Sequence, residues 1–158
     1  MNKQERDELI KEIKKSFEEA KKEMGFKASL EELDDVFFIT EYILHEGYVG
    51  EEFPHQVCSR IRDSLNAWAN YLHGLLMPNP QYLVNLTESK LINEEDRKAV
   101  WDLLKGAFAL TSLNSLYGLT KEKKQGAEFI DDSLEFWKKK FKPGLVKIMK
   151  KVNKGWSE

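Results

Sequence analysis

The sequence predicts an all-α protein, folded as a single-domain helical bundle of five to six mostly antiparallel helices. First, apolar residues recur at steps of three and four along most of the chain, which is the spacing of one helix face. Second, the only four prolines stand at positions 54, 78, 80 and 143, so long stretches are free of helix breakers. Third, Lys and Glu are abundant, with 21 and 19 copies, and both are good helix formers. The same excess is typical of thermophile surfaces and indicates a thermophilic source.

The first half of the chain predicts three helices. Residues 3–24 form the first, because apolar residues share one face and Gly25 follows the last of them. Ser29 and Glu32 have the spacing of a capping box, which opens a second helix that runs to about residue 46. Pro54 suits the first turn of a third helix, which ends before Pro78.

The second half predicts two or three more helices. Residues 81–92 fit either a short strand or one to two helical turns. Asn93 suits the N-cap of a helix that ends at Gly118, Thr120 caps the next helix, and Pro143 opens a last one. Short connections favour antiparallel neighbours. We therefore expect residues 1–158 to form one helical domain, in which 143–158 is a short Lys-rich amphipathic helix and tail.

Composition and charge exclude several classes of protein. A net charge of -2 with 11% aromatic residues is not typical of a disordered tail, and a single cysteine cannot form an internal disulfide. No stretch reaches the roughly 18 apolar residues of a membrane span. The N-terminal residues lack the apolar core of a signal peptide. We expect a soluble cytoplasmic protein that has no transmembrane segment and carries no cofactor.

Charge is divided unevenly along the chain. Residues 28–59 hold eight acids and no Lys or Arg, whereas residues 137–156 hold eight Lys and no acid. The lysines of the last helix share one face, apolar residues share another, and an aromatic residue follows. Such a helix can bind an acidic protein surface or phosphate groups, or it can pack on its own bundle with its lysines in solvent. The candidate residues are Lys147, Lys150, Lys151, Lys154 and Trp156.

A candidate metal site lies on the second predicted helix, at Asp34, Asp35, Glu41 and His45. Glu41 and His45 are four residues apart and share a face. Glu–His pairs hold metals in bundle cores, although ferritin-like proteins use Glu-x-x-His, and use it twice. The alternative is an ordinary surface pair.

The same acids invite comparison with all-α nucleotide pyrophosphatases of the MazG type, which hold magnesium with two acidic motifs. Either Glu31 with Asp34 or Glu32 with Asp35 has the E-x-x-D spacing of the second motif. Glu18, Glu19 and Glu23 resemble the first, E-E-x-x-E, but are one residue longer. Membership of that family does not follow from this partial match.

A row of polar residues follows one side of the third predicted helix, at Arg62, Asn66, Asn70 and His73. Their spacings of four, four and three stack them along the helix. Asn is a poor residue for a helix interior, so two in register indicate either a pocket wall or a buried polar network. His73 could then act as an acid or base near neutral pH. The alternative is a solvated helix face.

These patterns favour a non-catalytic helical protein that works by binding a protein partner or by self-association. One alternative is a divergent metal-dependent or nucleotide-processing enzyme that uses the acids of residues 31–41 with His45. A weaker alternative is non-specific nucleic-acid binding by the Lys-rich C-terminus, since a Lys surface attracts phosphates without reading bases.

Overall fold

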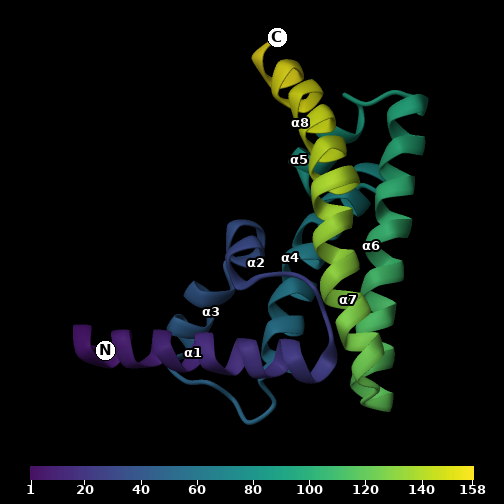
Figure 1. The fold of residues 1–158 in the computed structure, drawn as a ribbon. Helices are drawn as coiled ribbons and strands as arrows, with labels where there is room; N and C mark the ends of the chain where they lie inside the picture. The colour runs from purple at the N-terminus through teal and green to yellow at the C-terminus, as the bar shows by residue number, and fades with distance from the viewer. The chain divides into compact units, whose positions relative to one another are not determined.

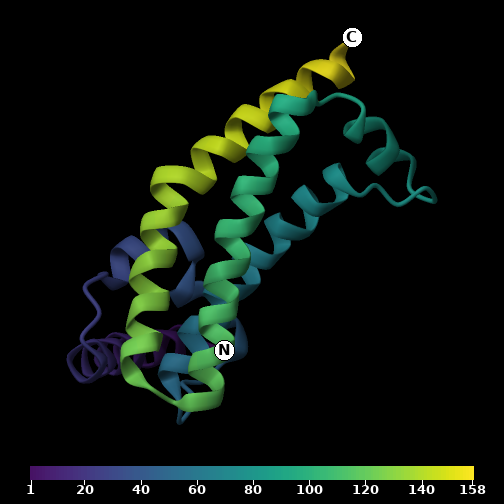
Figure 2. The same cartoon turned by 90° about the vertical axis from the view of Figure 1, so that its right-hand side faces the viewer.

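The computed structural model describes residues Met1–Glu158 and confirms the all-α class: the chain forms helices and no strands (Figures 1 and 2). The predicted number of helices is wrong, because the helix expected up to residue 46 is broken in two and residues 81–92 contain a short helix. The helices are α1 Lys3–Met24, α2 Leu30–Phe37, α3 Ile39–Glu46, α4 Phe53–Leu76, α5 Leu83–Ser89, α6 Glu94–Thr120, α7 Lys123–Phe136, the π-helix η1 Trp137–Phe141 and α8 Lys142–Ser157.

The chain packs into two compact units. The first, which we call the acidic unit, comprises Met1–Ser64 and Leu110–Leu134; the second, the basic unit, comprises Leu65–Ala109 and Glu135–Glu158. Three helices, α4, α6 and α7, contribute residues to both units. That the whole chain is one domain stays a prediction.

Helix α1 in the acidic unit begins and ends as its sequence predicts. Asn2 and Glu5 form a capping box at its start, and Gly25 ends it with a φ of 83°, the left-handed conformation that glycine adopts without steric cost. The five apolar residues of its predicted stripe are all buried. With residues of α2, α3, α4 and α7 they form the core, whose fully buried members include Ile13, Phe17, Leu33, Phe37, Ile43, Ile61 and Phe129.

The helix predicted from Ser29 breaks at Phe38, which separates α2 from α3 (Figure 1). Phe38 has a φ of 55°, a left-handed conformation that is rare for a bulky residue. Two contacts hold the break. The Asp34 carboxylate accepts hydrogen bonds from the Thr40 amide (2.7 Å) and hydroxyl (2.6 Å), and Arg60 Nε donates to the Phe37 carbonyl (2.6 Å). These side chains satisfy backbone groups that a continuous helix would pair internally.

In the basic unit, α8 runs beside the first half of α6 (Figure 2), and the apolar faces of both pack with the end of α4. Glycine makes the close approach of α8 possible, since a Cβ at Gly144 would lie 2.7 Å from Leu103 Cδ1 and one at Gly155 would lie 2.5 Å from Leu91 Cδ2. The buried residues of this core include Leu72, Leu75, Val100, Leu104, Ala107, Leu145, Ile148 and Val152.

The last helix begins at Lys142, so Pro143 lies in its first turn as predicted, but the π-helix η1 joins it to α7 without a break in the helix. The Lys142 amide donates to the Trp137 carbonyl, five residues back. Proline in a regular α-helix crowds the carbonyl four residues before it, and the wider π turn just ahead of Pro143 relieves that clash. Similarly, α6 continues through Gly118 to Thr120, since an interior glycine costs a helix only about 1 kcal/mol.

None of these helices combines the length and the apolar composition that crossing a bilayer requires.

Candidate functional site

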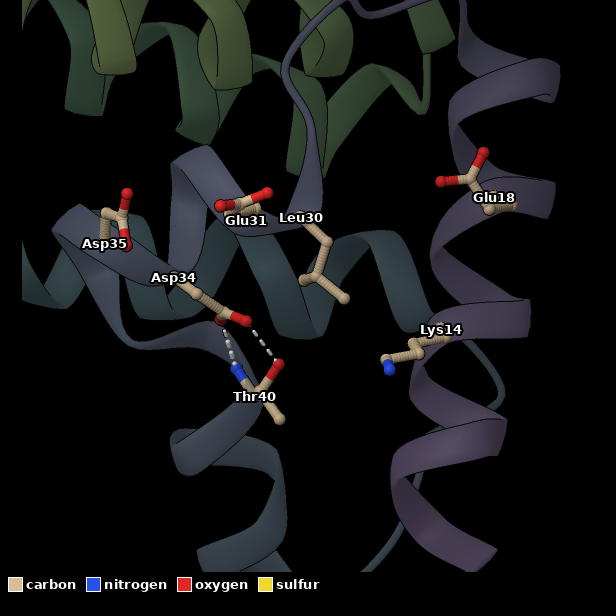
Figure 3. A pocket seen from close by; sticks show the side chains of 7 residues that line it. All are labelled: Lys14, Glu18, Leu30, Glu31, Asp34, Asp35 and Thr40. Carbon is tan, nitrogen blue, oxygen red and sulfur yellow. Dashed lines mark hydrogen bonds between the residues drawn. The ribbon is translucent and has the colours of Figure 1, made fainter. Parts of the chain in front are cut away.

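An open hollow of about 570 Å³ lies in the acidic unit between α1, α2 and α3 (Figure 3). Helix α1 contributes Lys14 and Glu18, whereas the opposite side comes from α2 and the start of α3. Asp34 turns both carboxylate oxygens toward Thr40, so its hydrogen bonds serve the helix break. The full lining is Lys14, Glu18, Leu30, Glu31, Asp34, Asp35 and Thr40.

The four candidate metal residues do not converge. Asp34 and Asp35 line the hollow, but Glu41 accepts from Arg6 at 3.1 Å and His45 is an exposed residue near the end of α3. No three His, Cys, Asp or Glu side chains are grouped so that they could hold a metal ion. Two acids of α2 make local structural contacts: Glu32 forms a capping box with Ser29, and Asp34 accepts hydrogen bonds from Thr40 at the start of α3.

The polar row of α4 lies at the protein surface. Asn70 and His73 are exposed, Asn66 is partly exposed, and Arg62 pairs with its own neighbour Asp63 at 2.8 Å. None of these four side chains is buried, and none lines the hollow between α1, α2 and α3. Their exposure favours the solvated helix face, which was the alternative interpretation.

The C-terminal lysine face is used in part inside the basic unit. Lys151 forms an ion pair with Asp96, whose side chain is only 5% exposed, and Trp156 Nε1 donates to Glu88 Oε1 at 2.9 Å. Lys154 pairs with Glu158 at 3.7 Å, one turn away on the same helix. Of the five candidate residues, Lys147 and Lys150 remain exposed without an ion pair.

Glu88 is the centre of a buried polar contact that the sequence did not reveal. It also accepts from the Tyr71 hydroxyl at 2.9 Å, so one carboxylate joins α4, α5 and α8. Burial, followed by this hydrogen bond, raises the pKa of the Tyr71 hydroxyl. Glu88 thus links Trp156 of α8 to α4 and α5, although Trp156 is 52% exposed.

The most distinctive surface of the basic unit is uncharged. No Asp, Glu, Lys or Arg occurs between Asp63 and Glu88, in a chain of which 33% is charged. Within this stretch, residues 77–87 follow α4 and include the first five residues of α5; we call them the uncharged segment. Four of its apolar side chains lie largely in solvent: Met77 (69% exposed), Tyr82 (64%), Leu83 (77%) and Val84 (56%).

The uncharged segment makes local hydrogen bonds and packs against α4, although its apolar side chains are exposed. The Asn79 side chain accepts from the Gln81 amide (3.0 Å), and just beyond the segment the Ser89 hydroxyl donates to the Leu75 carbonyl at the end of α4 (2.8 Å). Asn85 lies against α4 at Gly74, where a Cβ would be 3.2 Å from the side-chain nitrogen of Asn85. The exposed side chains thus lie on a segment that is hydrogen-bonded within itself and packed on the end of α4.

The charged and metal-binding patterns of the sequence do not point to this surface. The signal in the sequence is negative: a run of 24 residues, 64–87, has no Asp, Glu, Lys or Arg and contains one Trp, two Tyr and one Met. Charge depletion together with those residue types is typical of the core of a protein–protein interface.

In comparisons with known proteins, no family model, no curated protein and no solved structure matches this chain.

Proposed function

We propose that this protein works by binding another protein chain and that the uncharged segment is its contact surface. The observation that supports the proposal is the exposure of Met77, Tyr82, Leu83 and Val84 on a backbone tied down by hydrogen bonds. In the free protein these apolar side chains are exposed to water, and a bound partner would bury them.

The energetic gain from such burial is substantial. Full burial of a Val, Leu or Met side chain contributes about 1.5–3 kcal/mol, so a few anchors supply most of an interface's affinity. Tyr82 adds an aromatic ring with a polar tip, a residue type that is enriched at interfaces. Because the segment is already ordered, binding would lose little backbone entropy.

Photo-crosslinking tests the proposal directly. p-Benzoylphenylalanine is incorporated at position 83 in the cells that make the protein, and adducts are identified by mass spectrometry after irradiation. Lys98, an exposed residue of α6 in the same unit, gives the matched control position. We expect a discrete protein adduct from position 83 and little from position 98.

Two results would contradict the proposal: no protein adduct from position 83, or the same adducts in the same yield from both positions. The identity of the adduct, a second copy of this chain or a different protein, is read from its peptides.

A further inference from the structure

The two compact units carry opposite net charges, which the near-neutral total of the chain conceals. The acidic unit has 13 Lys and Arg against 20 Asp and Glu, a formal charge of -7. The basic unit has 12 against 7, a formal charge of +5. Positive and negative charge are therefore separated between the two compact units, and not only in the Lys-rich run near the C-terminus.

The charges that make this difference are available at the surface. Lys140, Lys142 and Lys150 of the basic unit are exposed and form no ion pair. In the acidic unit, Glu18, Glu31 and Asp35 are exposed around the hollow between α1 and α2 and form no ion pair either. Each unit thus has an excess of charge of one sign, part of it on exposed side chains without an ion pair.

We infer that the partner of the uncharged segment is a second copy of this chain, bound with the basic unit of each copy against the acidic unit of the other. This inference rests on the proposed function. A contact between two basic units would bring together formal charges of +5 and +5, and one between two acidic units would bring together -7 and -7. Repulsion between like charges disfavours both of these contacts. A contact between unlike units brings exposed lysines to exposed carboxylates.

Each unit also has exposed apolar side chains that such a contact would bury. The basic unit offers Tyr82 and Leu83, and the acidic unit offers Phe38 and Leu119, which are 57% and 84% exposed. Because every copy carries both units, two copies can make the contact twice and form a closed dimer. Apolar burial supplies affinity, and charge complementarity selects which unit meets which.

Charge-reversal variants of equal net charge test the inference. The triple variant Lys140→Glu, Lys142→Glu, Lys150→Glu changes the basic unit from +5 to -1. The control Lys3→Glu, Lys11→Glu, Lys15→Glu changes the acidic unit from -7 to -13 and gives the chain the same total charge. Circular dichroism verifies that both variants keep their helices.

Sedimentation velocity over a range of concentrations measures the dimer. We expect the basic-unit variant to weaken dimerisation about tenfold or more and the control to leave it unchanged or strengthen it. The wild-type dimer should also weaken as salt rises from about 0.05 M to 0.5 M, because screening shortens the reach of the charges.

A complementation experiment mixes two variants whose charges are reversed in different units. Glu18→Lys, Glu31→Lys, Asp35→Lys changes the acidic unit from -7 to -1. Mixed with the basic-unit variant, this protein should form a heterodimer through the one contact whose charges remain opposite, although each variant alone associates weakly.

The inference is overturned if the wild type is monomeric at every concentration, if both triple-Glu variants weaken the dimer equally, or if salt has no effect. A monomer whose position 83 crosslinks to a different protein refutes the self-association and leaves the proposed function standing. Absence of any crosslink refutes the proposed function itself.

Discussion

The ion pair between Asp96 and Lys151 gives the sharpest test of how the basic unit is built. Asp96 lies in the first turn of α6, and its side chain is 5% exposed. One oxygen accepts from the Asn93 amide at 3.1 Å in a capping box, and the other accepts from Lys151 of α8. Asp96→Asn keeps the shape and an amide oxygen for the cap but removes the charge that binds Lys151.

The expected loss follows from the environment of the pair. A hydrogen bond to a charged group contributes about 1.5–3 kcal/mol, and truncating one partner of a fully buried pair costs more. Because the Lys151 side chain is 40% exposed, water can replace part of the interaction. We therefore expect Asp96→Asn to lower the free energy of unfolding by about 1.5–3 kcal/mol.

Urea unfolding followed by circular dichroism, with a double-mutant cycle, isolates the contribution of the pair. The cycle combines Asp96→Asn with Lys151→Met and should give a coupling energy of about 0.5–3 kcal/mol. Lys154→Met is the control, since Lys154 is 78% exposed and its pair with Glu158 contributes about 0.5 kcal/mol or less.

The same pair predicts a dependence on pH. Burial alone would raise the pKa of Asp96, but Lys151, the Asn93 amide and Lys147 together lower it below its ordinary value of 3.8. The folded protein thus binds this proton less tightly than the unfolded chain does. The stabilisation is complete above about pH 3.8 and is lost as pH falls through the lowered folded pKa.

In the Asp96→Asn variant, the free energy of unfolding should therefore depend less on pH in the acid range than it does in the wild type. A variant within about 0.5 kcal/mol of wild type at neutral pH, or an unchanged acid curve, would refute the assignment. Lys151 would then be as free as the other exposed lysines of α8.

Two further predictions concern the acidic unit. Burial raises the pKa of the Cys58 thiol to about 12, so the native protein should not react with Ellman's reagent at mildly alkaline pH. The urea-unfolded chain should react at once. Rapid labelling of the native protein would contradict this prediction. Gly126→Ala should lower the free energy of unfolding by about 1–3 kcal/mol, because its Cβ would lie 2.6 Å from Met24 Cε and 2.9 Å from Tyr117 Cζ. The control Gly118→Ala enters open space within a helix and should stabilise the protein by about 0.5–1 kcal/mol, so equal losses in the two variants would contradict the packing argument.

Features set by neighbours in sequence were predictable. The stripe of α1, the end of that helix at Gly25, and the capping box at Ser29 all depend on residues at most four positions apart. The cap at Asn93 likewise forms with Asp96, three residues on. Local hydrogen bonding and the apolar period determine these features, so the sequence alone was sufficient for them.

Features set by distant residues were not predictable. The break at Phe38 depends on Arg60, 23 residues beyond the carbonyl that it binds. The hydrogen bond that Trp156 donates depends on Glu88, which lies 68 residues earlier in the chain. Residues 81–92 could have been strand or helix because contacts with α4, such as that of Ser89 with Leu75, decide the outcome. Periodicity carries no information about such pairings.

The π turn at Trp137–Phe141 lets the long helix take in one extra residue at one place, because its wide ring holds one more residue than a regular α-helical turn. Deleting a single lysine there would restore ordinary helical winding, so the residues that follow would keep their positions around the helix axis. Leu145, Ile148 and Val152 would still face the core. The deletion would instead bring back the clash between Pro143 and the carbonyl four residues before it, which the π turn relieves.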